Sequence, residues 1–238
     1  MMALFLKSGA VFLHIPKTGG TWVTKVLQEN GLVRCRFSHK HADVQRAVQS
    51  PSLYRYQNLK RTLRHGPGWH SGVSSAYKFC FVRNPLDWYE SWWAFMSQLD
   101  WPNFAPVRRN GVREWHPTAE LEDIRDDDFS CFMQNVRRTH PGFVSRMFAS
   151  FTNPETNFVG KQESLVDDLI DVLKLLNERF DEDRIRNSPR VNVSKPRSGR
   201  PVWRPEDRRR IMELEQDAMQ QFGYEESAVD CDAPAVSG

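Results

Sequence analysis

The sequence predicts an α/β fold, a three-layer sandwich with a central parallel sheet and helices on both faces. Val11–Ile15 and Tyr77–Val82 are short apolar runs bounded by turn residues, which is typical of strands buried on both sides. Each run leads directly into a segment with helical periodicity, and a third such unit begins at Asn157–Val159. Alternating strands and helices are the pattern of parallel sheets, whose ligands bind at the carboxyl ends of the strands.

Helices are expected where apolar residues recur on one face, with prolines near the starts and glycines after the ends. These segments cover residues 21–30, 86–99, 164–180 and 205–222. The second of them carries Trp88, Trp92 and Trp93, which we interpret as core residues. The polar stretches 34–72 and 100–150 are expected to hold loops and short helices.

The chain of 238 residues is long enough to bury a core, and we expect a single domain over residues 1–226 with a disordered tail over 227–238. Apolar residues make up 39% and charged residues 26%, which fits a globular protein. A formal net charge of +3 suits an anionic ligand but is too small to indicate nucleic acid as a partner.

Cysteine use and hydropathy favour a cytoplasmic protein without a membrane partner. The four cysteines are far apart and include no Cys-x-x-Cys pair, so they predict neither a metal site nor a disulfide framework. No stretch reaches the roughly 18 to 20 apolar residues that span a membrane. The N-terminal residues lack the basic region of a signal peptide and are interpreted as strand. The sequence gives no indication of the oligomeric state.

The segment HIPKTGGT, which joins the first expected strand to its helix, has the composition of an anion site. Gly19 and Gly20 let the backbone approach a phosphate closely, and the start of the helix adds a partial positive charge. Lys17 supplies a full charge, while Thr18 and Thr21 can donate hydroxyl hydrogen bonds. The pattern predicts phosphate binding, and a tight turn with an exposed lysine is the simpler alternative.

The arrangement of charges in this segment differs from the familiar phosphate loop. In GxxxxGK[ST] the lysine follows the glycines, whereas Lys17 precedes Gly19 and Gly20. The sequence shows no evident acidic strand end that would hold magnesium. We interpret the segment as a strand–turn–helix related to that loop in architecture, but with a different order of its lysine and glycines.

A second anion site is predicted at the end of the next strand. Arg83 ends the run Tyr77–Val82, and Ser91 lies in the helix that follows. A guanidinium offers a planar fork of donors that suits phosphate. Two anion sites at two strand ends favour a ligand with two separated phosphates. Taken singly, Arg83 fits a surface salt bridge and Ser91 fits a solvated serine.

HIPKTGGT followed by FVRNPLDWYESW resembles the sulfotransferases that use 3′-phosphoadenosine-5′-phosphosulfate, especially their carbohydrate-type and bacterial members. The resemblance implies a P-loop-like fold and a donor nucleotide that needs no metal. The first motif would bind the 5′-phosphosulfate and the second the 3′-phosphate. The implied cofactor-binding residues are Lys17, Thr18, Gly19, Gly20, Thr21, Trp22, Arg83 and Ser91.

The resemblance leaves the identity of the acceptor open. Gly160–Glu163 is similar to a further family segment, but Trp88 stands where relatives often carry arginine, and Trp203 stands where tyrosine is common. We expect a hydroxyl acceptor, either a small molecule or a glycan. A carbohydrate is favoured because loop tryptophans such as Trp101 and Trp115 can stack on sugar rings.

The acceptor hydroxyl needs a base, and the resemblance implies His41, in FSHKHADV, as a catalytic residue. His39 and Glu163 are the alternatives, and a surface histidine in a polar loop is the simpler interpretation of His41. His39 and His41 have no third ligand in register, so no metal site is expected. Lys17 is the other implied catalytic residue, because it would stabilise charge on the leaving phosphate. His14, beside the glycine turn, is expected to be structural.

Sulfuryl transfer by in-line displacement is the function that we expect, and two other classes fit the residues. A nucleotide kinase-like phosphotransferase would use the same loop with ATP and magnesium. A catalytically inactive nucleotide-binding protein would keep the fold without turnover. Lys17 argues against the inactive protein, because a site that only binds nucleotide has less need of this charge.

Overall fold

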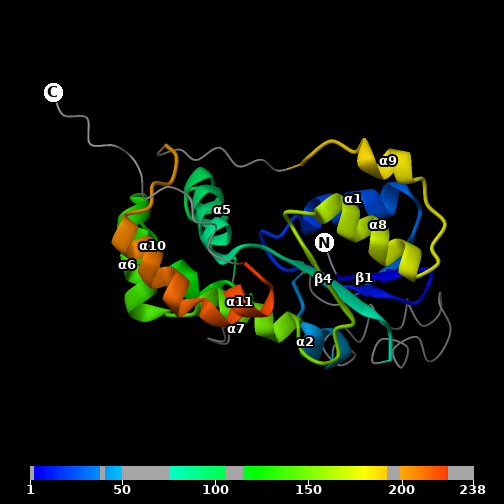
Figure 1. Ribbon diagram of the computed structural model, residues 1–238, viewed down its shortest axis with the longest axis horizontal. Helices are drawn as coiled ribbons and strands as arrows, with labels where there is room; N and C mark the ends of the chain where they lie inside the picture. Colours follow the sequence, from blue (N-terminus) through cyan, green and yellow to red (C-terminus); the bar gives the residue numbers. More distant parts are fainter. Residues whose placement is uncertain (1–2, 38–40, 50–74, 105–114, 192–198, 225–238) are drawn as a thin grey trace.

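The computed structural model describes residues 3–37, 41–49, 75–104, 115–191 and 199–224. These residues form a five-stranded sheet with the order β3-β1-β2-β4-β5 (Figure 1). The strands are β1 (Ala3–Leu6), β2 (Val11–Phe12), β3 (Val33–Phe37), β4 (Lys78–Val82) and β5 (Phe158–Lys161). β4 runs parallel to both β2 and β5, as the alternation of strands and helices predicts.

The sheet is mixed, whereas the sequence predicts a parallel one. β1 pairs antiparallel with β2 on one side and with β3 on the other. A tight turn causes this, because the Leu6 N–H donates to the Ala10 carbonyl at 2.8 Å and Gly9 takes a φ of 90°, which suits glycine. The N-terminal apolar region is therefore a hairpin, and the predicted strand Val11–Ile15 is shortened to Val11–Phe12.

β3 lies in the stretch 34–72, where the sequence predicts loops and short helices, so that prediction is wrong for these residues. Apolar and basic residues alternate over Val33–Phe37, and the two arginines are exposed while Phe37 is buried. This is the two-residue period of a strand with one solvated face. α2 (Val44–Gln49), in the same stretch, is a short helix as expected.

Helices cover both faces of the sheet. α1 (Gly20–Glu29), α8 (Leu165–Leu175) and α9 (Glu182–Arg186) pack on one face, and α2 lies on the other (Figure 1). The remaining helical elements gather beyond the end of the sheet: α5 (Pro85–Gln98), η1 (Ala119–Ile124), α6 (Phe129–Thr139), α7 (Phe143–Phe151), α10 (Pro205–Leu214) and α11 (Gln216–Gln221). No helix in the described ranges has both the length and the apolarity to cross a membrane.

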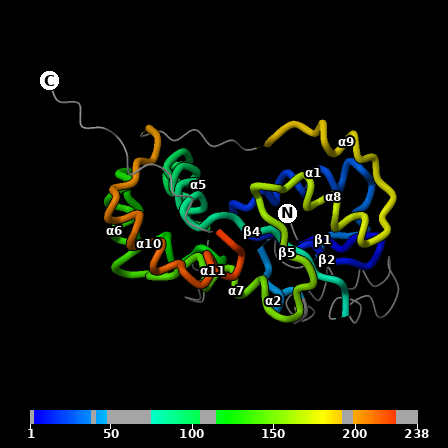
Figure 2. The backbone as a smooth tube through the Cα atoms, viewed as in Figure 1, coloured from blue at the N-terminus to red at the C-terminus, as the bar shows by residue number. Residues whose placement is uncertain are grey.

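The side chains of β4 show how the core is divided. Phe79 and Phe81 join the apolar cluster under α1 and α8, while Cys80 and Val82 join the cluster that continues into the helical group. This alternation is the consequence of the two-residue period of a strand. Since β4 leads directly into α5, one strand connects the sheet to the helical group (Figure 2).

The helix predictions for 21–30 and 86–99 are confirmed by α1 and α5, and Trp88, Trp92 and Trp93 are core residues. The other two helices are interrupted. The predicted helix 164–180 ends at Leu175, and Asn177 beyond it takes a left-handed φ of 52°. The predicted helix 205–222 is divided into α10 and α11 at Glu215.

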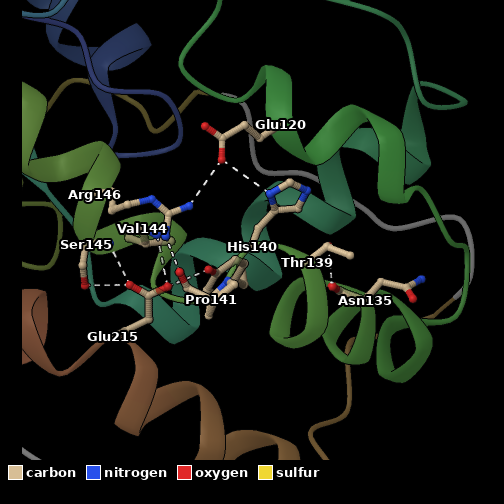
Figure 3. Close-up of polar contacts among 10 residues, drawn as sticks. Glu120, Asn135, Thr139, His140, Pro141, Val144, Ser145, Arg146 and Glu215 are labelled. Atoms are coloured by element: carbon tan, nitrogen blue, oxygen red, sulfur yellow. Dashed lines mark hydrogen bonds and ion pairs between the residues drawn. The ribbon is translucent and has the colours of Figure 1, made fainter.

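Glu215 is completely buried at that division, and its carboxylate holds three helices together (Figure 3). It accepts hydrogen bonds from the Tyr89 hydroxyl at 2.6 Å, the Ser145 N–H and hydroxyl, both at 2.7 Å, and the Val144 N–H at 3.1 Å. Burial raises the pKa of Glu215, and these four donors oppose that shift. The two N–H groups belong to the first turn of α7, so Glu215 also caps that helix.

We predict that Glu215→Gln lowers the free energy of unfolding by about 2–4 kcal/mol, because the amide NH2, at the position of either carboxylate oxygen, would face a backbone N–H that can only donate. Urea unfolding followed by circular dichroism measures this. Glu213→Gln is the matched control, since Glu213 is exposed and pairs with Arg210 at 2.6 Å on the surface. The control should cost less than about 0.5 kcal/mol. A Glu215→Gln variant as stable as the control would contradict this role of Glu215.

Candidate functional site

The residues of both predicted anion motifs lie at the carboxyl edge of the three parallel strands. Phe12 pairs with Phe79, and Val82 pairs with Lys161, so the residues that follow each strand meet at this edge. The Arg83 guanidinium donates to the Lys17 carbonyl at 3.5 Å. The sheet register therefore brings together segments separated by 66 residues.

The glycine turn has two residues with left-handed backbone conformation, of which one is a glycine. Gly19, the N-cap of α1, has a left-handed φ of 80°, and Lys17 has a φ of 65°. At Gly20 a Cβ atom would lie 2.1 Å from Cδ2 of His14, so the imidazole packs directly on the backbone at the start of the helix. His14 is buried, which fits its expected structural role. No acidic side chain lies in the first turn of α1, which leaves the helix N-terminus favourable for an anion.

Two contacts behind the turn fix its backbone. The indole N–H of Trp88 donates to the Pro16 carbonyl at 2.8 Å, and the hydroxyl of Thr18 donates to the Ile15 carbonyl at 3.0 Å. Trp88 is fully buried and Thr18 nearly so. The structure thus places the hydroxyl of Thr18 inside the turn, where it holds the loop. Trp88 belongs to the site as a support, a role that the sequence did not reveal.

Two cavities adjoin at this edge. The outer cavity, of about 860 Å³, extends past Glu163 and along the start of α8 to Arg190 and Arg200. The inner cavity, of about 420 Å³, extends past Lys17 and His41. Both are lined by Gly19, Trp22, Arg83, Ser91, Gln162 and Val191. Lys17, Gly20 and Thr21 line the inner cavity as well, so every predicted cofactor residue except Thr18 lines at least one of the two cavities.

Arg83 is a largely buried cation in the wall that the two cavities share. Burial lowers the pKa of its guanidinium, and the carboxylates of Asp87, Glu163 and Glu90 oppose that shift. Its Nε atom is buried and has no hydrogen-bond partner among the described residues. A buried donor on a cation is costly unless an acceptor completes it. Arg83 therefore brings a buried cation with an incomplete set of hydrogen bonds to the wall that both cavities share.

The carboxylates near Arg83 have fixed partners. Glu163 accepts from the Asn84 N–H at 2.8 Å and from the Tyr224 hydroxyl at 3.0 Å. Glu90 accepts from the indole of Trp203 at 2.6 Å, and burial raises the pKa of Glu90. Glu163 thus holds the backbone that follows Arg83. Because both of its oxygens have partners, it is better suited to a structural role than to acting as the catalytic base.

His41 is buried and lines the inner cavity together with Lys17. Nδ1 of His41 lies 2.9 Å from the His14 carbonyl oxygen, and the two rings are 4.7 Å apart between centroids. Because a carbonyl can only accept, Nδ1 carries the proton and the neutral ring keeps its lone pair on Nε2. This tautomer is the one that can remove a proton. His39, the other candidate, lies outside the described residues.

The walls of the inner cavity include aromatic residues that sequence reasoning missed. Phe95 and Phe104 stack at 5.9 Å with an interplanar angle of 10°, and the Lys17 ammonium lies 4.1 Å from the Phe95 ring centre. Trp101, a predicted sugar platform, is buried with its indole donating to Asp127 at 2.8 Å. The other platform, Trp115, is covered by the Arg46 guanidinium at 3.8 Å. Neither tryptophan lines a described cavity of the site.

Among the described residues, no three or more histidine, cysteine, aspartate or glutamate side chains form a group that could hold a metal ion. Comparison with protein-family models gave a match to the sulfotransferase family over residues 6–224. No curated protein and no solved structure matched the chain. The family match covers most of the 238 residues and includes both strand-end motifs. The chain therefore belongs to the sulfotransferase family.

Proposed function

We propose that this sulfotransferase moves a sulfuryl group from 3′-phosphoadenosine-5′-phosphosulfate to a hydroxyl group of a carbohydrate. The observation that carries the proposal is Arg83, whose buried Nε has no partner in the described chain and whose side chain lines both cavities. The donor nucleotide would occupy the outer cavity, with its 3′-phosphate at Arg83 and Ser91. Its 5′-phosphosulfate would lie at the turn from Lys17 to Thr21, and the acceptor would enter the inner cavity.

The chemistry follows from this placement. The acceptor oxygen attacks sulfur in line with the bond to the leaving phosphate, and that S–O bond breaks with its electron pair on the phosphate oxygen. His41 takes the acceptor proton at Nε2, because the His14 carbonyl fixes the proton on Nδ1. Lys17 and the N–H groups at the start of α1 stabilise the charge on the leaving phosphate. The products are a sulfate ester and adenosine 3′,5′-bisphosphate.

A carbohydrate acceptor is supported by the mixed character of the inner cavity. Phe95, Phe104 and Trp92 give it an aromatic wall, and His41 gives it a polar end. Aromatic faces pack on the apolar faces of sugar rings, while hydroxyl groups require hydrogen-bonding partners. We propose the aromatic wall in place of Trp101 and Trp115 as the platform for the ring.

The other expectations stand as proposals beside this one. We infer a P-loop-like three-layer arrangement, since a glycine turn joins β2 to α1 and the described helices lie on both faces of the sheet. A single domain is supported by the family match over residues 6–224. We further propose that the donor is used without a metal and that the protein acts in the cytoplasm.

Calorimetric titration with adenosine 3′,5′-bisphosphate, without magnesium, tests the donor site. We predict that Arg83→Ala weakens binding at least about tenfold, or about 1.4 kcal/mol, because the phosphate loses its guanidinium partner. Arg179→Ala removes the same charge from an exposed position outside both cavities and should change affinity less than about twofold. Wild-type protein that binds ATP with magnesium, but not the bisphosphate, would support the phosphotransferase alternative.

Substitution of His41 tests the base. In His41→Asn the amide N–H can still donate to the His14 carbonyl, but no basic nitrogen remains. We predict a loss of about 10²–10⁴-fold in kcat/KM with bisphosphate affinity within about twofold of wild type. His140→Asn, a histidine outside both cavities, is the control. Full activity of His41→Asn would remove His41 from the mechanism and move attention to His39.

A further inference from the structure

Tyr224, which follows α11, packs beside the last residue of β5 at the carboxyl edge of the parallel strands. Tyr224 is buried, and the ammonium of Lys161 lies 4.9 Å from the centre of its ring. The same ammonium donates to the Gly223 carbonyl at 3.4 Å, and the Tyr224 N–H donates to the Met219 carbonyl at 2.8 Å. Contacts from α11 and from β5 therefore fix the position of the phenol ring.

The hydroxyl of Tyr224 is one of two donors that hold the carboxylate of Glu163. It donates to Oε2 at 3.0 Å, and the Asn84 N–H donates to Oε1 at 2.8 Å. Burial raises the pKa of Tyr224, so the phenol keeps its proton at neutral pH and remains a donor. Because Glu163 is exposed and lines the outer cavity, these two hydrogen bonds determine where its carboxylate lies, in place of close packing.

Glu163 and Arg83 line the same cavity from neighbouring strand ends. The Gln162 N–H donates to the Val82 carbonyl at 2.8 Å, which ties the residue before Glu163 to the residue before Arg83. Glu163 is one of the carboxylates whose charge acts on the pKa of the Arg83 guanidinium. Within the described chain these two side chains nevertheless form no ion pair, and the guanidinium donates to the Lys17 carbonyl.

A second carboxylate beside Arg83 is held in a similar way. Glu90 also acts on the pKa of Arg83, and it accepts from the indole N–H of Trp203 at 2.6 Å. Trp203 precedes α10 and Tyr224 follows α11, so neutral donors on both sides of this helix pair hold acidic side chains that Arg83 could otherwise attract. An arginine that is paired with a carboxylate binds phosphate less well, because the anion must first displace its competitor.

We propose that Tyr224 is a positioning residue of the donor site, whose hydroxyl holds the Glu163 carboxylate away from Arg83. Without this donor, one oxygen of Glu163 can pair with the guanidinium and compete with an anionic ligand there. Tyr224 acts through Glu163, since Tyr224 itself lines neither cavity of the site. The inference rests on the proposed function, in which the 3′-phosphate of the donor lies at Arg83.

A double-mutant cycle with Tyr224→Phe and Glu163→Gln tests the proposal. The first substitution keeps the aromatic ring and removes the donor, whereas the second keeps an acceptor for the Asn84 N–H and removes the charge. Calorimetry measures the affinity for adenosine 3′,5′-bisphosphate in wild type, in both single variants and in the double variant. Asp87, a third carboxylate beside Arg83, is common to all four proteins, so its effect cancels.

We predict that Tyr224→Phe weakens binding at least about fivefold in the wild-type background, because the released carboxylate competes for the largely buried guanidinium of Arg83. In the Glu163→Gln background the same substitution should cost less than about twofold, since no charged competitor remains. In assays of sulfuryl transfer, Tyr224→Phe should raise KM for the donor and leave kcat within about twofold of wild type. Bound donor displaces the carboxylate, so the defect is confined to binding.

Tyr89→Phe is the matched control. It also removes a hydroxyl that donates to a carboxylate, that of Glu215 at 2.6 Å, but neither residue lines a cavity of the site. Its affinity for the bisphosphate should stay within about twofold of wild type.

Two results would overturn the positioning role of Tyr224. One is a Tyr224→Phe variant that binds the bisphosphate as well as wild type. The other is an equal loss of affinity in the wild-type and Glu163→Gln backgrounds, because Tyr224 would then act through the fold and not through the charge of Glu163. Failure of wild-type protein to bind the bisphosphate is a different result, since it would refute the proposed function and this inference with it.

Discussion

The parallel pairing of β4 with both β2 and β5 is the constraint on which the site depends. Parallel strands end on the same edge, so this pairing fixes where the glycine turn, Arg83 and Gln162 meet. Residues adjacent in the cavity walls come from positions far apart along the chain. β4 has a second role, because its continuation into α5 carries Ser91 and Phe95 to the same cavities. β4 therefore sets both the register of the parallel strands and the position at which α5 begins.

The two strand-end motifs, which form the proposed donor side of the site, could be recognised in the sequence because their information is local. Lys17, Gly19 and Gly20 are consecutive or nearly so, and the chemistry of a strand, a glycine turn and a helix start can be derived from such a segment alone. Arg83 could be singled out for the same reason, because it directly follows the next buried strand. The mixed sheet was missed although Lys7, Ser8 and Gly9 form a polar break between two apolar runs. Such a short break marks a turn but does not by itself show that the strands on its two sides pair with each other.

The two hydrogen bonds that hold the glycine turn could not be predicted from the sequence, for another reason. Trp88 reaches the Pro16 carbonyl across 72 residues, and nothing near Trp88 in the sequence distinguishes it from the core tryptophans beside it. The hydroxyl of Thr18 looked like a phosphate donor by residue type, yet its nearest acceptor is the Ile15 carbonyl inside the turn. In both cases the partner is a backbone carbonyl, whose position depends on the fold. Such contacts require coordinates.

The proposed acceptor side of the site depends throughout on contacts between segments that are far apart in the sequence. Phe104, His116 and His41 line the inner cavity from three separate segments, and the tautomer of His41 depends on the His14 carbonyl, which the sequence around His41 does not reveal. This is why the resemblance predicted a nucleotide donor and left the acceptor open: the motifs that carry the resemblance are runs of neighbouring residues, whereas the inner cavity is lined by residues from scattered segments. If the acceptor enters the inner cavity as proposed, its selectivity depends on side chains that line this cavity but do not belong to the strand-end motifs.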